Sequence, residues 1–390
     1  MTQAPSWEEW VAERNAAIAA ASRWRTTRAF DALGPAGTLA GINGGAPADV
    51  VSFAANDYLG LSTHPAVTEA AAGALERWGA GAAASRLITG TRPVHVTLET
   101  ALADWKGAEA ALAFSSGFAA NLGVLATLGG PGVRIVSDEY NHASIIDGAR
   151  MARAEVAVYP HLDVAAAAEL VAEWPGRSLV VSDAVFSMDG DQADIGALMD
   201  VCASTGAALV LDEAHSVWGP EVPAVPSPAE GTGRHPSTGP MLVRVGTLSK
   251  TLGAQGGFVA ADSAVVALLV NAARPFIFST GLSPADAAAA GAALGVVTSE
   301  EGAALIGRVR ALTDRLAPQH PSPIVPIVLG DEARALDASA ALARVGYWVP
   351  AIRPPTVAPG TSRLRVTFSA AHSDAQVEGL LSALDSLGLR

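Results

Sequence analysis

Lysine is almost absent from this sequence of 390 residues, because Lys106 and Lys250 are the only two and every other basic residue is arginine. A guanidinium stays protonated and forms no imine, whereas a lysine amine can act as a nucleophile or a base. Lys250 follows the apolar run Met241 to Val245 within Gly246-Thr-Leu-Ser-Lys-Thr-Leu-Gly, which predicts a position just beyond a buried strand. We therefore interpret Lys250 as a functional amine and Lys106 as a surface residue.

Cysteine, long apolar runs and clusters of basic residues are lacking as well. Cys202 is the only cysteine, which excludes an internal disulfide and a metal site with several thiolates, and its context predicts a buried helix position. No run approaches ~18 apolar residues, so no membrane span is expected. The net charge of −13 and the lack of a Lys/Arg cluster argue against nucleic-acid binding. The N-terminus carries Glu8, Glu9 and Glu13 instead of a signal peptide, so we expect a cytoplasmic protein.

Apolar residues are abundant, at 50% of the chain, and alanine is frequent, which is typical of a globular, helix-rich enzyme. From Val51 onward, short apolar strands alternate with Ala-rich helices. This alternation predicts an α/β fold with a mostly parallel central sheet between helices. The expected strands are 110–114, 133–136, 156–159, 178–181, 208–211, 242–245 and 258–260, and the expected helices include 65–78, 94–106, 117–128 and 164–173.

Three parts are expected along the chain. Residues 1–50 form an N-terminal arm and linker, with an amphipathic helix from Trp7 to about Arg28 and a possible short hairpin within 34–48. Residues 51–284 form the large domain, in which the Pro-, Ser- and Gly-rich stretch 221–239 predicts a surface loop. Residues 285–390 form a smaller α+β domain, with an Ala-rich helix, strands near 324–329, 348–352 and 364–368, and a closing helix.

Polar groups follow several of the expected strands, where ligands bind in parallel sheets. Asp212 ends one strand, and a buried carboxylate there is costly unless a cation or a strong donor faces it. A protonated ring nitrogen of a cofactor would be such a partner, with His215 in the following turn; the alternative is that Asp212 caps a helix. Asp212-Glu-Ala-His215 also spells a helicase tetrapeptide, but the sequence lacks the P-loop that a helicase needs.

Further strand ends add a phosphate site and a flat side chain. Ser115-Ser-Gly-Phe-Ala-Ala-Asn121 follows a strand and opens a helix, whose N-terminal amides suit a phosphate. His142 follows another strand, and Val185-Phe-Ser-Met-Asp-Gly-Asp191 predicts a turn because it lacks the alternating ligands of a calcium loop. Pyridoxal 5′-phosphate requires this combination: donors for the phosphate, a carboxylate for the ring nitrogen, a flat cover for the ring and an amine for the aldehyde.

Nearly the whole chain resembles the α-oxoamine synthase family of fold-type I pyridoxal-phosphate enzymes. This resemblance implies a PLP-dependent transferase with a mostly parallel central sheet, a smaller α+β C-terminal domain and a homodimeric assembly. It is carried by Phe53-Ala-Ala-Asn-Asp-Tyr-Leu-Gly-Leu-Ser62, Ser85-Arg-Leu-Ile-Thr-Gly-Thr91, Ser116-Gly-Phe-Ala-Ala-Asn121, Val185 to Asp191, Asp212-Glu-Ala-His215, Thr247-Leu-Ser-Lys250 and Gln255-Gly-Gly257.

The resemblance also implies a role for each matching site residue. Lys250 bonds the cofactor aldehyde, Asp212 pairs with the ring nitrogen, and His142 stacks on the ring. His215 and Ser187 lie near the phenolic oxygen, and the phosphate is held by the Gly117 and Phe118 amides and the Thr247 hydroxyl. The substrate-binding residues implied are Arg25 for the acyl substrate, Arg353 for the amino-acid carboxylate, Thr356 in the pocket, His142, and Asn56 beside the lysine.

The stretch Ala351-Ile-Arg-Pro-Pro-Thr-Val357 is similar to the family members that condense L-alanine with pimeloyl-CoA or a pimeloyl-acyl-carrier protein. The alternatives are a glycine-using 2-amino-3-ketobutyrate CoA ligase or another member of the family. A protein of a different class, a non-catalytic relative that serves in interactions, is disfavoured because every expected catalytic group is present. Trp218 and the 221–239 stretch depart from the family pattern, which leaves acyl-chain selectivity open.

Overall fold

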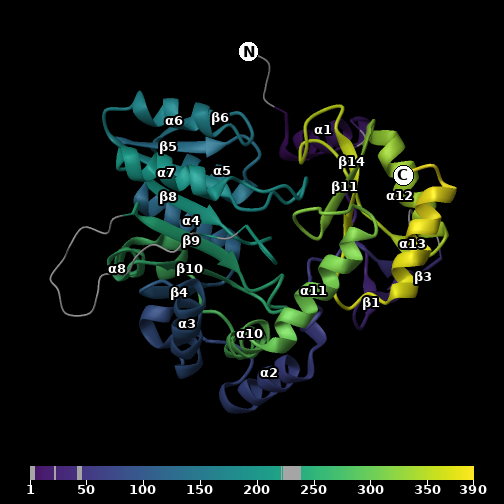
Figure 1. Ribbon diagram of the computed structural model, residues 1–390, viewed down its shortest axis with the longest axis horizontal. Helices are drawn as coiled ribbons and strands as arrows, with labels where there is room; N and C mark the ends of the chain where they lie inside the picture. The colour runs from purple at the N-terminus through teal and green to yellow at the C-terminus, as the bar shows by residue number, and fades with distance from the viewer. Residues whose placement is uncertain (1–4, 22, 42–45, 221, 223–238) are drawn as a thin grey trace. The chain divides into compact units, whose positions relative to one another are not determined.

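Two units make up the fold, and the computed structural model describes residues 5–21, 23–41, 46–220, 222 and 239–390 (Figure 1). The larger unit comprises Asn56–Pro323 with Phe368–Ala371, and the smaller unit comprises Ile324–Thr367, His372–Arg390 and the described part of Met1–Ala55. This division differs from the boundaries that the sequence predicts at residues 50 and 284. Helix α10 (Pro284–Val297) packs against α2 (Pro65–Trp78) inside the larger unit.

A seven-stranded sheet lies at the centre of the larger unit. Its strand order is β4-β10-β9-β8-β7-β5-β6, and all neighbours are parallel except β10, which is antiparallel to both β4 and β9. The mostly parallel sheet predicted from the sequence is thus confirmed. The strands are β4 (Ala110–Phe114), β5 (Val133–Asp138), β6 (Glu155–Tyr159), β7 (Arg177–Asp183), β8 (Ala208–Asp212), β9 (Leu242–Thr247) and β10 (Gly257–Ala261).

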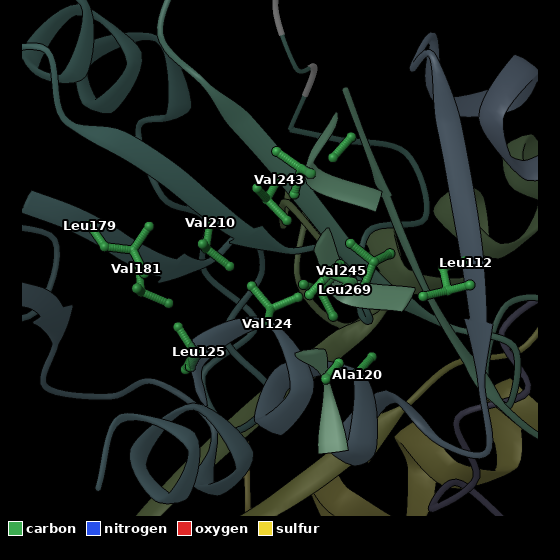
Figure 2. Packing of buried hydrophobic residues seen from close by; sticks show 14 of the residues in the cluster. Leu112, Ala120, Val124, Leu125, Leu179, Val181, Val210, Val243, Val245 and Leu269 are labelled. Carbon is green, nitrogen blue, oxygen red and sulfur yellow. The ribbon is translucent and has the colours of Figure 1, made fainter. Parts of the chain in front are cut away.

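Both faces of this sheet are apolar. Successive strand residues point to opposite sides of a sheet, and the strands carry apolar residues at consecutive positions. On β7, Leu179 and Val181 join one hydrophobic cluster and Val180 joins the other. Figure 2 shows the first cluster, in which strand side chains such as Val210 gather against Val124 of α4 (Gly117–Leu128). The second cluster includes residues of α6 (Val164–Ala172) and α7 (Ile195–Thr205), Cys202 among them. Cys202 is therefore a buried helix residue, as predicted, and burial raises the pKa of its thiol to about 12.

The helices of the larger unit begin at the residues their sequences favour. Pro65 and Pro93 occupy the first turns of α2 and α3 (Pro93–Lys106), and the Ser116 hydroxyl accepts the Ala119 N–H at the start of α4. Among the described helices none is by itself long and apolar enough to cross a bilayer; the bent pair α10 and α11 meets that test only when combined. The other helices are η2 (Leu61–Thr63), the π-turn η3 (Arg86–Gly90), α5 (Ala143–Ala152), α8 (Ser263–Ala272), α9 (Arg274–Ile277) and α11 (Glu300–Asp314).

The smaller unit contains two small sheets. One has the order β1-β2-β3-β12, and the other has the order β11-β14-β13. A hairpin is present, but its first strand, β1, precedes the stretch 34–48 in which the sequence predicts it. The prediction for the N-terminal arm was wrong in part, because α1 (Trp7–Ala20) ends before Arg28 and all its residues are exposed. The elements are α1, β1 (Phe30–Ala32), β2 (Ala36–Leu39), β3 (Ala48–Ser52), β11 (Ile324–Gly330), α12 (Glu332–Arg344), β12 (Tyr347–Trp348), β13 (Ala351–Ile352), β14 (Ser362–Thr367) and α13 (Asp374–Ser386).

Lys106 is not the surface residue that the sequence predicts. Its side chain is 9% exposed, and its Nζ lies 3.2 Å from Glu213 Oε2 directly after β8. Arg244 of β9 binds the same carboxylate through both Nε, at 2.9 Å, and Nη2, at 2.6 Å. Burial alone raises the pKa of Glu213, but the two cations outweigh burial and hold that pKa below its usual value. This buried cluster of Lys106, Glu213 and Arg244 links the end of α3 to two central strands.

We expect Glu213→Gln to lower the free energy of unfolding by roughly 3–5 kcal/mol, because it leaves two buried cations without their counter-charge. Lys106→Met should cost less, since Arg244 and Glu213 keep their paired hydrogen bonds. Urea denaturation of the two variants measures the difference. Asp147→Asn is the control, because the Arg150–Asp147 pair is largely exposed and should contribute nothing measurable. Equal losses in Glu213→Gln and Lys106→Met would contradict this account.

Candidate active site

The polar residues singled out in the larger unit lie at one edge of its sheet, at the carboxyl ends of parallel strands. Asp212 is the last residue of β8, and Thr247 is the last residue of β9. His142 follows β5 and caps α5, while Ser187 lies in the turn after β7. The strand-end positions predicted from the sequence are confirmed by these elements.

Lys250 lies in a hydrogen-bonded chain that leads into the core. Its Nζ is 2.8 Å from His215 Nε2, and His215 Nδ1 is 2.5 Å from the hydroxyl of Tyr58. Tyr58 is fully buried, and its hydroxyl also donates to Asn56 Oδ1 at 3.2 Å. The structure thus brings together three residues predicted for the site, Lys250, His215 and Asn56. It adds Tyr58, to which the sequence assigned no role.

Asp212 is a buried carboxylate, 5% exposed, that is held by neutral donors. Its Oδ1 accepts the Ala214 N–H at 2.8 Å, and its Oδ2 accepts the Asn121 amide at 2.6 Å. Across residues 46–220 and 239–390, no lysine or arginine forms an ion pair with it, whereas the adjacent Glu213 has two. A charge this deep is stable where a cation faces it, and the protonated ring nitrogen of pyridoxal phosphate is such a cation.

His142 presents a flat and uncharged ring. Burial lowers the pKa of its imidazole, which favours the neutral form. Its backbone N–H donates to Asp183 Oδ2 at 2.7 Å, and its Nδ1 lies 2.7 Å from the Ser144 hydroxyl. Burial and the nearby Asp212 raise the pKa of Asp183 well above its usual value. A neutral imidazole anchored in this way suits the role of covering a cationic ring.

The start of α4 has the strand-to-helix geometry expected of a phosphate turn. Gly117 and Phe118 are its first residues, where backbone N–H groups and the helix dipole favour an anion. The Thr247 side chain lies beside them, because a Cβ added to Gly117 would sit 3.3 Å from the Thr247 Cβ. A Cβ on Gly257 would come within 2.4 Å of the Gly117 amide nitrogen, so this glycine lets β10 pass closely. Together with Asp212, His142 and Lys250, these groups fit pyridoxal 5′-phosphate.

Several predicted residues are not brought to this edge by the described contacts. Arg25, Arg353 and Thr356 belong to the smaller unit, so their substrate contacts stay predictions. Trp218 packs under the Arg310 guanidinium, 5.6 Å from its ring centre, which agrees with a packing role. Most of the 221–239 stretch lies outside the described residues.

Sequence reasoning missed four polar residues of this edge: Tyr58, Asn121, Ser144 and Asp183. Each lies in or near a segment that was recognised: Asn121 ends a quoted motif, and Ser144 lies two residues after His142. The sequence feature that could have identified them is their position at or shortly after the end of a strand. The sequence could not show which residue each of them would contact. Asn121 and Asp212, for example, are hydrogen-bonded although they are 91 residues apart in the chain.

His161 is a second charged group near this edge, in the loop after β6. Its Nδ1 lies 3.0 Å from Asp138 Oδ1 and its Nε2 lies 2.9 Å from Asp191 Oδ2. Tyr140 stacks on the imidazole, with the ring centres 4.3 Å apart. Burial alone lowers the pKa of His161, but the two carboxylates outweigh burial and raise it to about 9. The protonated ring therefore ties together the loops that follow β5, β6 and β7.

With the fold and the site described, comparison with known proteins defines the class. The family model for aminotransferase class I and II matches residues 48–384. The chain belongs to this family, and it is a pyridoxal 5′-phosphate-dependent enzyme. Solved serine palmitoyltransferases, one from Sphingomonas wittichii and one holding PLP, superpose with a TM-score of 0.82 at 29% identity, covering 98% of each chain.

Curated relatives are more specific. The chain is 48% identical over 369 residues to an 8-amino-7-oxononanoate synthase of Anaeromyxobacter dehalogenans, covering 92% of this chain and 90% of the relative. It is 44% identical over 388 residues to an 8-amino-7-oxononanoate synthase of Methylorubrum populi, covering 98% of this chain and 95% of the relative. These matches confirm the predicted resemblance to the α-oxoamine synthases, and they confirm an enzyme rather than a non-catalytic relative.

The His161 cluster predicts a pH-dependent stability. Because the folded-state pKa of about 9 lies above the ordinary 6.5, the cluster stabilises the protein fully below about pH 6.5 and loses this effect as pH rises through 9. Above the range where the carboxylates titrate, His161→Gln should therefore be less stable than the wild type at pH 6 by roughly 1–3 kcal/mol. The two proteins should converge above pH 9. Guanidinium denaturation at a series of pH values tests this, and a constant difference across that range would refute it.

Proposed function

We propose that this chain condenses L-alanine with a pimeloyl thioester, releasing CO2 and the free thiol and yielding 8-amino-7-oxononanoate for biotin biosynthesis. One structural observation carries the chemistry: the amine of Lys250 lies 2.8 Å from His215 at the same sheet edge as the buried Asp212 carboxylate. The choice of substrates is supported by relatives of that name that are 43–48% identical over most of the chain.

Pyridoxal phosphate, when bound, supplies an electron sink that stabilises negative charge at the amino-acid Cα. Asp212 would keep the ring nitrogen protonated, which makes the ring a stronger electron acceptor, and His142 would cover one face of the ring. The Gly117 and Phe118 amides and the Thr247 hydroxyl would hold the phosphate, and Ser187 with His215 would lie near the phenolic oxygen. These contacts fix the ring and leave catalysis chiefly to orientation and charge delocalisation.

Lys250 has two tasks in this proposal. Its amine would hold the cofactor through the aldehyde, and once freed, Nζ would remove the Cα proton of alanine. His215 is close enough to exchange a proton with Nζ, and Asn56 and Tyr58 hold His215 in place. The carbon freed of its proton attacks the thioester carbonyl and expels the thiol, and loss of CO2 followed by reprotonation completes the reaction.

The smaller unit supplies the remaining substrate contacts in this proposal. Arg353 binds the alanine carboxylate, which turns the Cα–H bond perpendicular to the cofactor ring. Thr356 lines the pocket, and Arg25 meets the acyl substrate. The acyl donor is pimeloyl-CoA or a pimeloyl-acyl-carrier protein, and the enzyme works in the cytoplasm.

We also propose a homodimer, formed through an exposed apolar patch on the larger unit. The segments Ser85–Ile88 and Phe278–Gly281 lie side by side, joined by the Ser85–Thr280 bridge and the Gly281 N–H to Ala84 O hydrogen bond. Ile88 is 75% exposed and Phe278 is 70% exposed. Exposed apolar side chains on two adjoining segments favour burial against a second copy of the chain.

Thiol release by the cofactor-loaded protein tests the reaction. With pimeloyl-CoA, we expect release with L-alanine and a product whose mass is that of 8-amino-7-oxononanoate, and little release with glycine or L-serine. Lys250→Ala should lose turnover by several orders of magnitude, because it removes both the covalent anchor and the base. Release with glycine alone would indicate a 2-amino-3-ketobutyrate ligase, and release with serine alone would indicate a sphingoid-type synthase. Full activity of Lys250→Ala would refute the mechanism.

Light scattering after size-exclusion chromatography tests the dimer. Phe278→Glu should shift the protein toward monomer, because a charge in the centre of the patch opposes its burial. Met151→Glu is the control, since Met151 is 51% exposed on α5, outside the patch. A monomeric wild type with full activity would contradict the dimer, as would an unchanged mass for Phe278→Glu.

A further inference from the structure

A continuous hydrogen-bond chain joins the residue that covers the cofactor ring to the residue that meets the ring nitrogen. His142 Nδ1 lies 2.7 Å from Ser144 Oγ, Ser144 Oγ lies 2.9 Å from Asn121 Nδ2, and Asn121 Nδ2 lies 2.6 Å from Asp212 Oδ2. Asn121 is 1% exposed and Ser144 is fully buried. The chain crosses from α5 through α4 to the end of β8.

The direction of this chain follows from the chemistry of its members. An ionised carboxylate only accepts hydrogen bonds, so the Asn121 group facing Asp212 must be the NH2 group, whose second hydrogen points to Ser144. Within the described residues Asn121 Oδ1 is buried without a partner, which agrees with this orientation, since the flipped amide would place oxygen against oxygen. The Ser144 backbone N–H donates to His142 Nδ1, so Nδ1 is an acceptor, and the Ser144 hydroxyl, which accepts from Asn121, donates its single hydrogen to Nδ1.

The same reasoning fixes the tautomer of His142. Its Nδ1 accepts the Ser144 hydroxyl and also lies 3.2 Å from the Ser144 N–H. A nitrogen that accepts two hydrogen bonds carries no proton, so the neutral ring is protonated at Nε2. The uncharged ring state agrees with the effect of burial on its pKa.

We propose that Asn121 and Ser144 are positioning residues that hold His142 and Asp212 as one unit, with His142 neutral and protonated at Nε2. The proposal rests on the cofactor role assigned to these two residues above. Its physical basis is that His142 would contact the face of one rigid ring and Asp212 its ring nitrogen, so the two side chains must keep a fixed separation and angle. A hydrogen-bonded chain with a single allowed direction supplies that constraint, and neither Asn121 nor Ser144 needs to touch the ring.

Cofactor affinity measured over a double-mutant cycle tests the coupling. The full-length protein, freed of cofactor, is titrated with pyridoxal 5′-phosphate for the wild type, Asn121→Ala, Ser144→Ala and the double variant. Each single variant should weaken binding by about tenfold, and the double variant should match the weaker single variant within about twofold, because either change breaks the chain. Where Asn121→Ala does not fold, Asn121→Ser replaces it, since serine cannot reach both partners.

The control for these variants is Ser178→Ala on β7. Ser178 is 9% exposed, and its hydroxyl is buried without a partner in the described part of the chain, so the change removes a buried serine outside the hydrogen-bond chain. Its cofactor affinity should equal that of the wild type. Losses that multiply in the double variant would refute the coupling, as would a Ser144→Ala protein that behaves like Ser178→Ala.

A second measurement reads the tautomer without cofactor or substrate. The groups facing His142 are Asp212 on β8, Asp183 on β7 and Lys250 after β9. The Ser144 hydroxyl stabilises the unprotonated Nδ1, so Ser144→Ala should raise the pH at which His142 titrates, whereas Ser178→Ala should not. Nitrogen-15 NMR of labelled histidines, with the His142 resonance assigned from His142→Asn, measures this. A proton on Nδ1 in the neutral wild type would overturn the proposal. Because no amino acid or thioester is used, failure here leaves the proposed reaction untouched, and failure of the thiol-release assay leaves this proposal standing.

Discussion

Two consecutive buried carboxylates at the end of β8 impose the main constraint on the larger unit. A charge with so little exposure is stable only where donors or cations surround it. Glu213 faces Lys106 and Arg244, which pins α3 and β9 to this strand end. Within the described residues Asp212 accepts hydrogen bonds from the amides of Ala214 and Asn121, and it therefore suits the positive ring nitrogen of a cofactor. One acidic pair thus serves stability through one member and chemistry through the other.

The parallel sheet then brings the other groups to the same edge. Strands β5, β7, β8 and β9 run in one direction, so the segments that follow them gather beside Asp212. Hydrogen bonds between these segments hold them in place: His142 to Asp183 across β5 and β7, and His161 between Asp138 and Asp191. The Lys250, His215 and Tyr58 chain adds the segment at the start of the larger unit.

Most strands and helices of this protein could be predicted from local patterns. Strand β4 and helices α2 and α4 have the predicted bounds, because apolar runs, helix-initiating prolines and Ser116 act within a few residues. The extent of α1 and the burial of Lys106 could not be predicted in that way. Every residue of α1 is exposed, so no core contact extends the helix, and Lys106 is buried by a partner 107 positions later in the chain.

By itself, the sequence determined the element order, the rarity of lysine that singles out Lys250, and the types of residue that follow each strand. These properties depend on residues that are neighbours along the chain, so they can be recognised from the sequence. The tertiary structure alone decided that Asn121 and Ser144 connect His142 to Asp212, that Tyr58 supports His215, and that Glu213 pairs with Lys106. The physical reason is that a hydrogen bond or ion pair depends on separations of about 3 Å in space, and the packing of the sheet and its helices sets those separations.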